Sequence, residues 1–380
     1  MDNKVYKYEL FEKMIKSFAE TEVKPLAADV DEREYFPIDT VKKMAQLGLF
    51  GIIIPKEYGG AGGDYKMYLK AVEELSKVCA TTGVILSAHT SLCCCPIMEY
   101  GSEEQKKKYL PKLASGQWLG AFALTEPNAG TDANNQTTTA VADGDNYILN
   151  GSKIFITNAG KADVYFIVAV TGRNAKGVEC AAFIVESTFK GFTTGKKERK
   201  MGIRGSSTCE LIFEDCVVPK ENLIGKVGEG LKYAMKTLDG GRIGIAAQAL
   251  GIAEGALTET LNYTKERKQF GKSISAFQNT QFTLADMAVK VEAARGLLQH
   301  AIEAKETKSK ELSVAAAMAK LFCSETAMEV TTKAVQLHGG YGYTREYPVE
   351  RMMRDAKITE IYEGTSEVQK MVISGALLRK

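Results

Sequence analysis

The segment Ile361-Tyr362-Glu363-Gly364-Thr365 sets an acid beside a glycine, where a carboxylate can serve as a general base. The glycine permits an unusual backbone angle or a close approach. Ser366 and Gln369 have the spacing of a capping box, which predicts that a helix opens directly after this turn. An acid on such a turn can project into a cleft instead of lying along a helix, a setting that suits a base. The residues alone, however, favour the interpretation that Glu363 is one of 47 acidic residues on a solvated face.

Two glycine-rich segments come close to nucleotide-binding motifs. Gly339-Gly340-Tyr341-Gly342 follows a helical pattern instead of a strand and lacks the full GxGxxG spacing. Gly271-Lys272-Ser273 ends like a phosphate-binding loop, but Glu266 stands where that motif needs its first glycine. Taken alone, each segment is more typical of a helix end than of a binding site.

The apolar pattern divides the chain into three parts that must position these residues. Residues 1–116 follow the helical period, residues 117–225 form short alternating runs rich in β-branched side chains, and residues 226–380 are helical again. This α, β, α order favours segregated domains over a doubly wound sheet. The last part contains three long helical segments: Ala249–Arg267, Phe277–Lys305 and Glu311–His338.

Composition excludes several classes of protein. Lys and Arg number 49 against 47 Asp and Glu, a net charge of +2, which argues against nucleic acid or an anionic membrane as partner. Apolar runs are interrupted before they reach membrane-spanning length, so we expect a soluble, cytoplasmic protein with no membrane insertion. The eight cysteines include Cys93, Cys94 and Cys95, and there is no CxxC and only three histidines, so no metal site is predicted. We expect buried, reduced thiols.

Two longer motifs carry a resemblance to a known family. The first is A-L-T-E-P-N-A-G-T-D at Ala123–Asp132, and the second is Q-L-H-G-G-Y-G-Y-T-R-E-Y-P-V-E-R-M-M-R-D at Gln336–Asp355. In this order they resemble the signatures of the acyl-CoA dehydrogenase family, most closely its short-chain, butyryl-CoA-type members. Asn134 and Asn135 depart from the small residues usual there. The resemblance implies an α+β multidomain fold: an N-terminal all-α domain (1–116), a middle β-barrel-like domain (117–225) and a C-terminal four-helix-bundle domain (226–380).

The resemblance also implies a reaction, the removal of two hydrogens from an acyl-CoA thioester. A base takes the α-proton, and hydride passes from the β-carbon to N5 of FAD. Glu363 matches the base of short-chain relatives, while the position that carries the base in other relatives is Gly241 here. An ordinary surface ion pair between Asp239 and Arg242 stays open as an alternative to contact with CoA. The resemblance assigns four residues to the substrate: Thr131, Asp239, Arg242 and Gly364.

FAD is the cofactor that the resemblance implies. An arginine fork suits its pyrophosphate, and the Thr157 hydroxyl is expected near N5. Family members usually carry Trp where Phe155 stands, so less contact area with the flavin is expected. Residues carried over beside the isoalloxazine ring are Phe122, Leu124, Thr125, Gly130, Thr131, Phe155, Ile156 and Thr157. Those for the remaining FAD contacts are Arg267, Gln278, Gln336, Gly339, Gly340, Thr365 and Glu367.

Partners follow from the same resemblance: an acyl-CoA or enoyl-CoA substrate, an electron-transferring flavoprotein, and a homotetramer built as a dimer of dimers. Family pyrophosphate contacts come partly from the neighbouring subunit. The direction stays open between dehydrogenation in fatty acid metabolism and reduction of an acrylyl- or aryl-acrylyl-CoA. An acyl-CoA oxidase and a non-enzymatic scaffold rank lower, since the extra C-terminal domain of typical oxidases is missing and both Glu363 and Arg267 are present.

Overall fold

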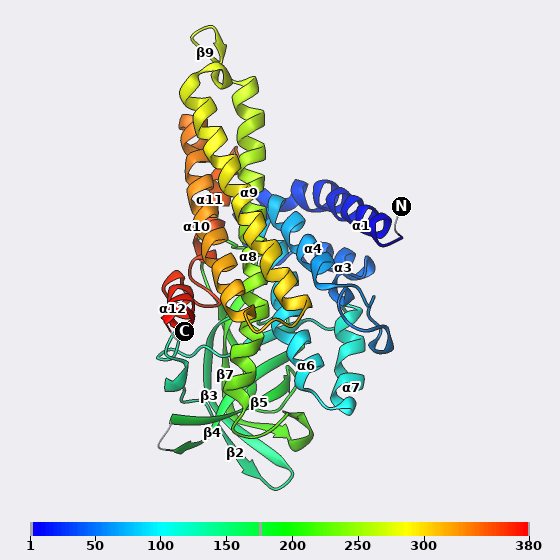
Figure 1. Ribbon diagram of the computed structural model, residues 1–380. Coiled ribbons are helices and arrows are strands. Elements are labelled where there is room, and N and C mark those ends of the chain that lie inside the picture. Colours follow the sequence, from blue (N-terminus) through cyan, green and yellow to red (C-terminus); the bar gives the residue numbers. More distant parts are fainter. Residues whose placement is uncertain (1–2, 175–176, 379–380) are drawn as a thin grey trace.

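Residues 3–174 and 177–378 are described by the computed structural model, and they follow the helical, β, helical order that the sequence predicts (Figure 1). The β-domain lies at one end of the molecule, and the long C-terminal helices extend away from it, with the N-terminal helices along one side (Figure 1). The predicted fold class is confirmed. The predicted limits at residues 116 and 225 stay predictions. They fall between α7 (Glu103–Ala114) and β1 (Gly120–Ala123) and between β8 (Leu223–Ile224) and α8 (Gly230–Glu266).

The N-terminal domain consists of helices whose apolar faces pack on one another and on α8 (Gly230–Glu266). The Asp64 carboxylate caps α4 by accepting from the amide of Met67 at 3.0 Å. Ser102 and Gln105 form a capping box at the start of α7. The helices are α1 (Asn3–Phe18), α2 (Ala27–Glu32), α3 (Ile38–Gln46), α4 (Tyr65–Val78), α5 (Ala80–Ser87), α6 (Cys95–Tyr100) and α7 (Glu103–Ala114).

One buried helical stretch corrects a sequence expectation. Helices α5 and α6 are joined by a π-helix, η5 (Ala88–Cys94), so that Ala80–Tyr100 is long and apolar enough to cross a membrane by length and composition. The sequence predicts no stretch of that length, because Gly, Pro or charge interrupts each apolar run. The stretch is almost entirely buried inside the protein, so core packing accounts for its apolar character. All eight cysteines are free and buried, as predicted.

The middle domain is a mixed sheet in the order β6-β7-β3-β2-β4-β5-β8, with β1 paired to β4. Strands β1 and β2 both run parallel to β4, and the other pairs of this sheet are antiparallel. A register shift between Lys153 and Ile156 interrupts the β3–β7 pairing, and Phe155 has a φ of 59° there. The strands are β1 (Gly120–Ala123), β2 (Thr139–Asp143), β3 (Asn146–Thr157), β4 (Val164–Asn174), β5 (Gly177–Glu186), β6 (Phe192–Lys197), β7 (Thr208–Pro219) and β8 (Leu223–Ile224).

Helix α8 is the longest element and begins at Gly230, where the helical pattern of the sequence returns, although the long segment predicted there starts only at Ala249. Glycines weaken the pattern before Ala249, but the glycines of α8 allow close packing. A Cβ at Gly251 would lie 2.3 Å from the carbonyl oxygen of Glu73, and one at Gly255 would lie 2.1 Å from that of Lys77. The other C-terminal elements are β9 (Lys268–Gln269), β10 (Lys272–Ser273), α9 (Gln278–Glu306), α10 (Leu312–His338), α11 (Val349–Thr359) and α12 (Ser366–Leu378).

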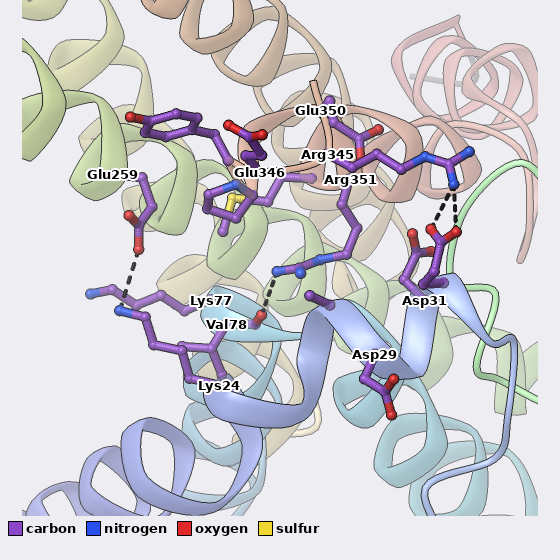
Figure 2. A pocket seen from close by; sticks show the side chains of 15 residues that line it. Lys24, Asp29, Asp31, Lys77, Val78, Glu259, Arg345, Glu346, Glu350 and Arg351 are labelled. Atoms are coloured by element: carbon purple, nitrogen blue, oxygen red, sulfur yellow. Dashed lines mark hydrogen bonds and ion pairs between the residues drawn. The ribbon is translucent and has the colours of Figure 1, made fainter. Parts of the chain in front are cut away.

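Charged residues of the second signature join the N-terminal and C-terminal domains. A cavity of about 700 Å³ lies between them. Figure 2 shows the polar contacts made by charged side chains that line it. The Arg351 guanidinium donates to the carbonyl of Val78 at 3.1 Å (Figure 2). Arg345 pairs with Glu32 at 2.6 Å. This part of the signature therefore fixes how the domains meet, away from the candidate base.

Candidate active site

Glu363 lies on the turn between α11 and α12, where the backbone takes unusual angles. Its φ is 54°, and that of Gly364 is 94°. A left-handed conformation is costly for a residue with a side chain, so surrounding contacts must hold the turn. The predicted capping box is wrong. The Gln369 side chain donates back to the carbonyl of Gly364 at 2.8 Å, and the Thr365 hydroxyl accepts from the amide of Val368 at 3.4 Å.

The Glu363 carboxylate points at α8, where Gly241 leaves room for it. A Cβ at Gly241 would lie 1.9 Å from Oε2 of Glu363 and 2.7 Å from Cδ2 of Leu92. Any side chain at position 241 would therefore displace the acid. This contact explains why a base at position 363 goes with a glycine at position 241.

The environment of this carboxylate suits proton transfer. Oε2 of Glu363 is buried and has no hydrogen-bond partner, although the residue as a whole is partly exposed. Burial raises the pKa of Glu363 to about 8, and the nearby charges of Lys320 and Arg242 oppose that rise. A buried acid with a pKa near the working pH is well matched to general-base catalysis.

Asp239 and Arg242 form a buried ion pair instead of the surface pair left open by the sequence. The Arg242 guanidinium donates to Oδ1 of Asp239 at 2.9 Å, and the hydroxyl of Ser313 donates to Oδ2 at 2.5 Å. Nε of Arg242 is buried without a partner. Contact of these residues with CoA stays a prediction.

Flavin-side candidates gather in the β-domain around a buried ion pair that the sequence analysis did not single out. Nζ of Lys153 donates to the carboxylate of Glu126 at 2.7 Å, to the side chain of Gln136 at 2.8 Å and to the carbonyl of Leu124 at 3.0 Å. Glu126 also accepts from the amides of Thr137 and Thr138. These contacts fix the loop that carries Leu124, Thr125, Gly130 and Thr131.

Phe155 and Phe122 lie in different settings in this domain. Phe155 is 62% exposed on the irregular part of β3, which leaves its ring available to a ligand. The Phe122 ring stacks on Phe166 with centroids 5.6 Å apart, so this side chain contributes to the domain core. Ile156 is buried, as a core residue would be.

Four other FAD candidates meet at the far end of α8. Arg267, Gln336, Gly339 and Gly340 line a cavity of about 460 Å³, with the Arg267 guanidinium 5.3 Å from the ring centre of Tyr341. Gln278 is the first residue of α9 and is not among the residues that line this cavity. Arginine and backbone amides of this kind suit a phosphate-bearing ligand.

The structure does not bring the Arg267 group and the base together. Glu363 meets α8 at Gly241, whereas Arg267 directly follows the end of this helix. At 1.5 Å per residue, the two points are about 39 Å apart along the helix axis. Thr365 and Glu367, in contrast, lie on the turn and helix that follow the base.

The fold and the site together define a class of protein, a three-domain enzyme with a buried acid poised for proton transfer. Family models agree along nearly the whole chain: the N-terminal domain of acyl-CoA dehydrogenase matches residues 7–117, the middle domain 121–216 and the C-terminal domain 228–378. The chain belongs to the acyl-CoA dehydrogenase family and is an oxidoreductase of that family.

Known proteins of similar sequence are acyl-CoA enzymes. The chain is 62% identical to "Acyl-CoA dehydrogenase, short-chain specific" of Clostridium acetobutylicum, with 98% of each chain covered. It is 50% identical to "Acryloyl-CoA reductase (NADH)" of Anaerotignum propionicum, covering 98% of this chain and 94% of the relative.

Solved structures agree with the fold. Butyryl-CoA dehydrogenase from Megasphaera elsdenii has a TM-score of 0.95 at 51% identity, with 98% of each chain covered. A chain in the structure described as "Electron transferring flavoprotein of Acidaminococcus fermentans: Towards a mechanism of flavin-based electron bifurcation" has a TM-score of 0.95 at 56% identity, again with 98% coverage of each. An acyl-CoA dehydrogenase complexed with FAD from Bacillus anthracis has a TM-score of 0.92 at 36% identity, covering 99% of this chain and 68% of that one.

Proposed function

We propose that this protein is an FAD-dependent dehydrogenase of short-chain acyl-CoA thioesters, in which Glu363 takes the α-proton. The observation that carries the proposal is the buried, unpaired Oε2 of Glu363 in the space left by Gly241. When bound, FAD supplies a hydride acceptor at N5 for the hydrogen on the β-carbon. The similarity to a short-chain-specific relative supports a short acyl chain.

Glu363 does its work only in the ionised form. Because its pKa lies at about 8, a substantial fraction is protonated at neutral pH, and the ionised fraction grows as the pH rises. The strained turn aims the carboxylate at the space beside Gly241, where Oε2 has no hydrogen-bond partner that would compete for its lone pair. This arrangement favours proton abstraction over a purely structural role.

The residues present fit FAD, and their separation supports a cofactor site shared between two copies of the chain. The loop fixed by Lys153 and the exposed ring of Phe155 offer contacts for the flavin end. Arg267 lies about 39 Å from the base along α8, too far to contact the same FAD molecule. In this proposal Arg267 and the cavity beside it hold the FAD of a neighbouring copy, with a homotetramer as the assembly.

The proposed electron partner is an electron-transferring flavoprotein, and the proposed compartment is the cytoplasm. Similarity to a chain from a structure of such a flavoprotein supports this partner. Similarity to an acryloyl-CoA reductase supports a second candidate, the same site used to reduce an enoyl-CoA. Anaerobic assays in both directions with the flavoprotein as electron carrier separate the two.

The experiment that tests the proposed function combines a substrate panel with the variant Glu363→Gln. Bleaching of the flavin absorbance is followed with acyl-CoAs of increasing chain length, and we expect short chains to react fastest. Glu363→Gln keeps the shape of the side chain but cannot accept the proton, so flavin reduction should fall by about 10² to 10⁴-fold. The variant should stay yellow and still be reduced by dithionite. Retention of more than about a tenth of the wild-type rate contradicts the role of Glu363.

A further inference from the structure

A buried lysine on α10 touches the turn that carries the base. Lys320 has no exposed surface, and its Nζ donates to the carbonyl of Gly364 at 2.8 Å. It occupies the apolar stripe of α10, between the buried residues Ala316 and Cys323. A lysine is almost never fully buried unless its charged group is paired or hydrogen-bonded. The inference drawn from this contact rests on the proposed function of Glu363.

The contact holds a strained part of the backbone. Glu363 and Gly364 both have positive φ, and the carbonyl of Gly364 accepts a second hydrogen bond, from Gln369 at 2.8 Å. Two donors on one carbonyl fix the orientation of the turn and therefore the direction in which the Glu363 side chain leaves it. Of these two donors, only Lys320 carries a charge.

The charge of Lys320 is the one best placed to act on Glu363. The other nearby cation, Arg242, is already paired with Asp239. Lys320 forms no ion pair with any residue that the structure describes, and burial lowers its pKa to about 8, while Glu363 opposes that decrease. Titratable or charged groups that interact with the base come from α4, α8, α10 and the turn: Tyr65, Tyr68, Arg242, Lys320 and Tyr362. Glu360 and Glu367 act on Lys320.

We propose that Lys320 is a positioning residue for the base: its ammonium group clamps the carbonyl of Gly364, fixes the direction of Glu363 and favours the ionised carboxylate. A clamp without a charge would orient the base equally well. By favouring the ionised carboxylate, the charge also sets the pH range in which Glu363 can accept a proton.

Two variants separate these contributions. Lys320→Met removes both the hydrogen bond and the charge, whereas Lys320→Gln keeps a donor for the carbonyl and removes only the charge. Lys333→Met on the same helix is the matched control, because Lys333 pairs with Glu329 on the partly exposed side of α10. FAD content and thermal unfolding establish that each variant is folded and loaded.

The first measurement is the pH profile of flavin reduction by butyryl-CoA. Loss of a nearby positive charge should move the midpoint of the profile up by about one pH unit in both Lys320 variants. At neutral pH this shift means about tenfold slower reduction, with recovery at higher pH. Lys320→Met should be slower than Lys320→Gln, since it also frees the turn. Lys333→Met should keep the wild-type profile.

The second measurement does not depend on turnover. The carbonyl stretch of the protonated Glu363 carboxyl is followed against pH by infrared difference spectroscopy, with Glu363→Gln as the blank. The midpoint should rise in Lys320→Gln and stay unchanged in Lys333→Met. This readout still tests Lys320 if butyryl-CoA fails to reduce the wild-type flavin, a result that would overturn the proposed function alone.

The proposal is overturned if folded Lys320→Gln keeps the wild-type midpoint in the infrared titration. An equal midpoint shift in Lys333→Met overturns it as well, because the effect would then not be specific to the clamp. If Lys320→Met does not fold, Lys320→Gln decides the question by the same two measurements.

Discussion

Lys153 in the β-domain and Lys320 in the C-terminal bundle are both fully buried lysines, yet they end on different partners. Burial lowers the pKa of each to about 8. Lys153 meets the carboxylate of Glu126 together with two neutral acceptors. Lys320 meets a backbone carbonyl, and the nearest acid that senses its charge is the candidate base.

These different partners allow a buried lysine either to hold a loop or to influence a nearby carboxylate. Burial alone would raise the pKa of Glu126, but Lys153 and the hydrogen bonds to Thr137 and Thr138 keep it below its usual value. That pair stays ionised and holds a loop rigidly. At Lys320 the charge is incompletely matched, so it remains available to influence the Glu363 carboxylate.

The largest expected effect is the loss of stability on removal of Lys153. Lys153→Met leaves the Glu126 carboxylate buried without its cation, which should destabilise the protein by about 3 to 5 kcal/mol and release FAD. Lys320→Met removes a buried charge that has no carboxylate in an ion pair with it, so a much smaller change in stability is expected. Chemical denaturation with the ratio of FAD to protein measures both. Equal losses in the two variants would show that the two lysines play the same structural part.

A second prediction separates stability from chemistry at the base. Gly241→Ala puts a methyl group where Oε2 of Glu363 lies, so flavin reduction should fall by at least about tenfold, as expected when a base is displaced. The helix itself should not suffer, because alanine favours a helix over glycine by about 1 kcal/mol. Gly240→Ala is the matched control, since its Cβ would lie 3.1 Å from the Tyr65 hydroxyl and does not meet the base. Similar rates in both variants would place the base elsewhere.

The raised pKa of Glu363 should make the stability of the folded protein depend on pH. The folded-state pKa of Glu363 is raised, so the folded protein prefers the protonated acid and loses stability as the pH rises from about 4.5 to about 8. Glu363→Gln removes this loss, and its free energy of unfolding relative to wild type should therefore increase across that window. Denaturant titrations at a series of pH values test this. A constant difference would mean that the pKa of Glu363 is not raised.

For Lys320, the effect of pH on stability should have the opposite sign and fall at higher pH. Its folded-state pKa is lowered, so the cost of its buried charge is present below pH 8 and disappears as the pH rises from about 8 to about 10.5. The free energy of unfolding of Lys320→Met relative to wild type should therefore decrease across this alkaline range. The same denaturant series measures this difference, and a difference that does not depend on pH would contradict the assigned shift.

The smallest expected effect is on FAD retention at the end of α8, away from both Lys153 and Lys320. Arg267→Lys keeps the charge but loses the two-pronged fork that suits pyrophosphate, so FAD should dissociate several-fold faster. Lys268→Arg, one residue further on an exposed strand, is the control and should retain FAD normally. Unchanged FAD retention in Arg267→Lys would remove Arg267 from the cofactor site.

The sequence by itself determined the order of helical and β domains, because the spacing of apolar side chains is a local property of each segment. It also singled out Glu363, because the motif that carries this residue is one short continuous segment, Ile361–Thr365. The long segment predicted in α8 began only at Ala249 because glycines weaken the local pattern before it, and their benefit appears only where distant elements pack against them, as Ala181 does at Gly230 and Ser87 at Gly244. The capping box failed because the strained turn draws the Gln369 side chain toward the carbonyl of Gly364.

Only the tertiary structure decided which distant residues meet at the base. Gly241 on α8, Lys320 on α10 and Glu363 on the turn before α12 come together because three separate elements pack at one point, and no spacing in the sequence encodes that contact. The folded structure also separates Arg267 from the base along α8, although the resemblance assigns one to FAD and the other to the reaction that FAD serves. Local patterns fix which elements form, whereas desolvation, charge and contact at the site depend on the packing of elements that lie far apart in the chain.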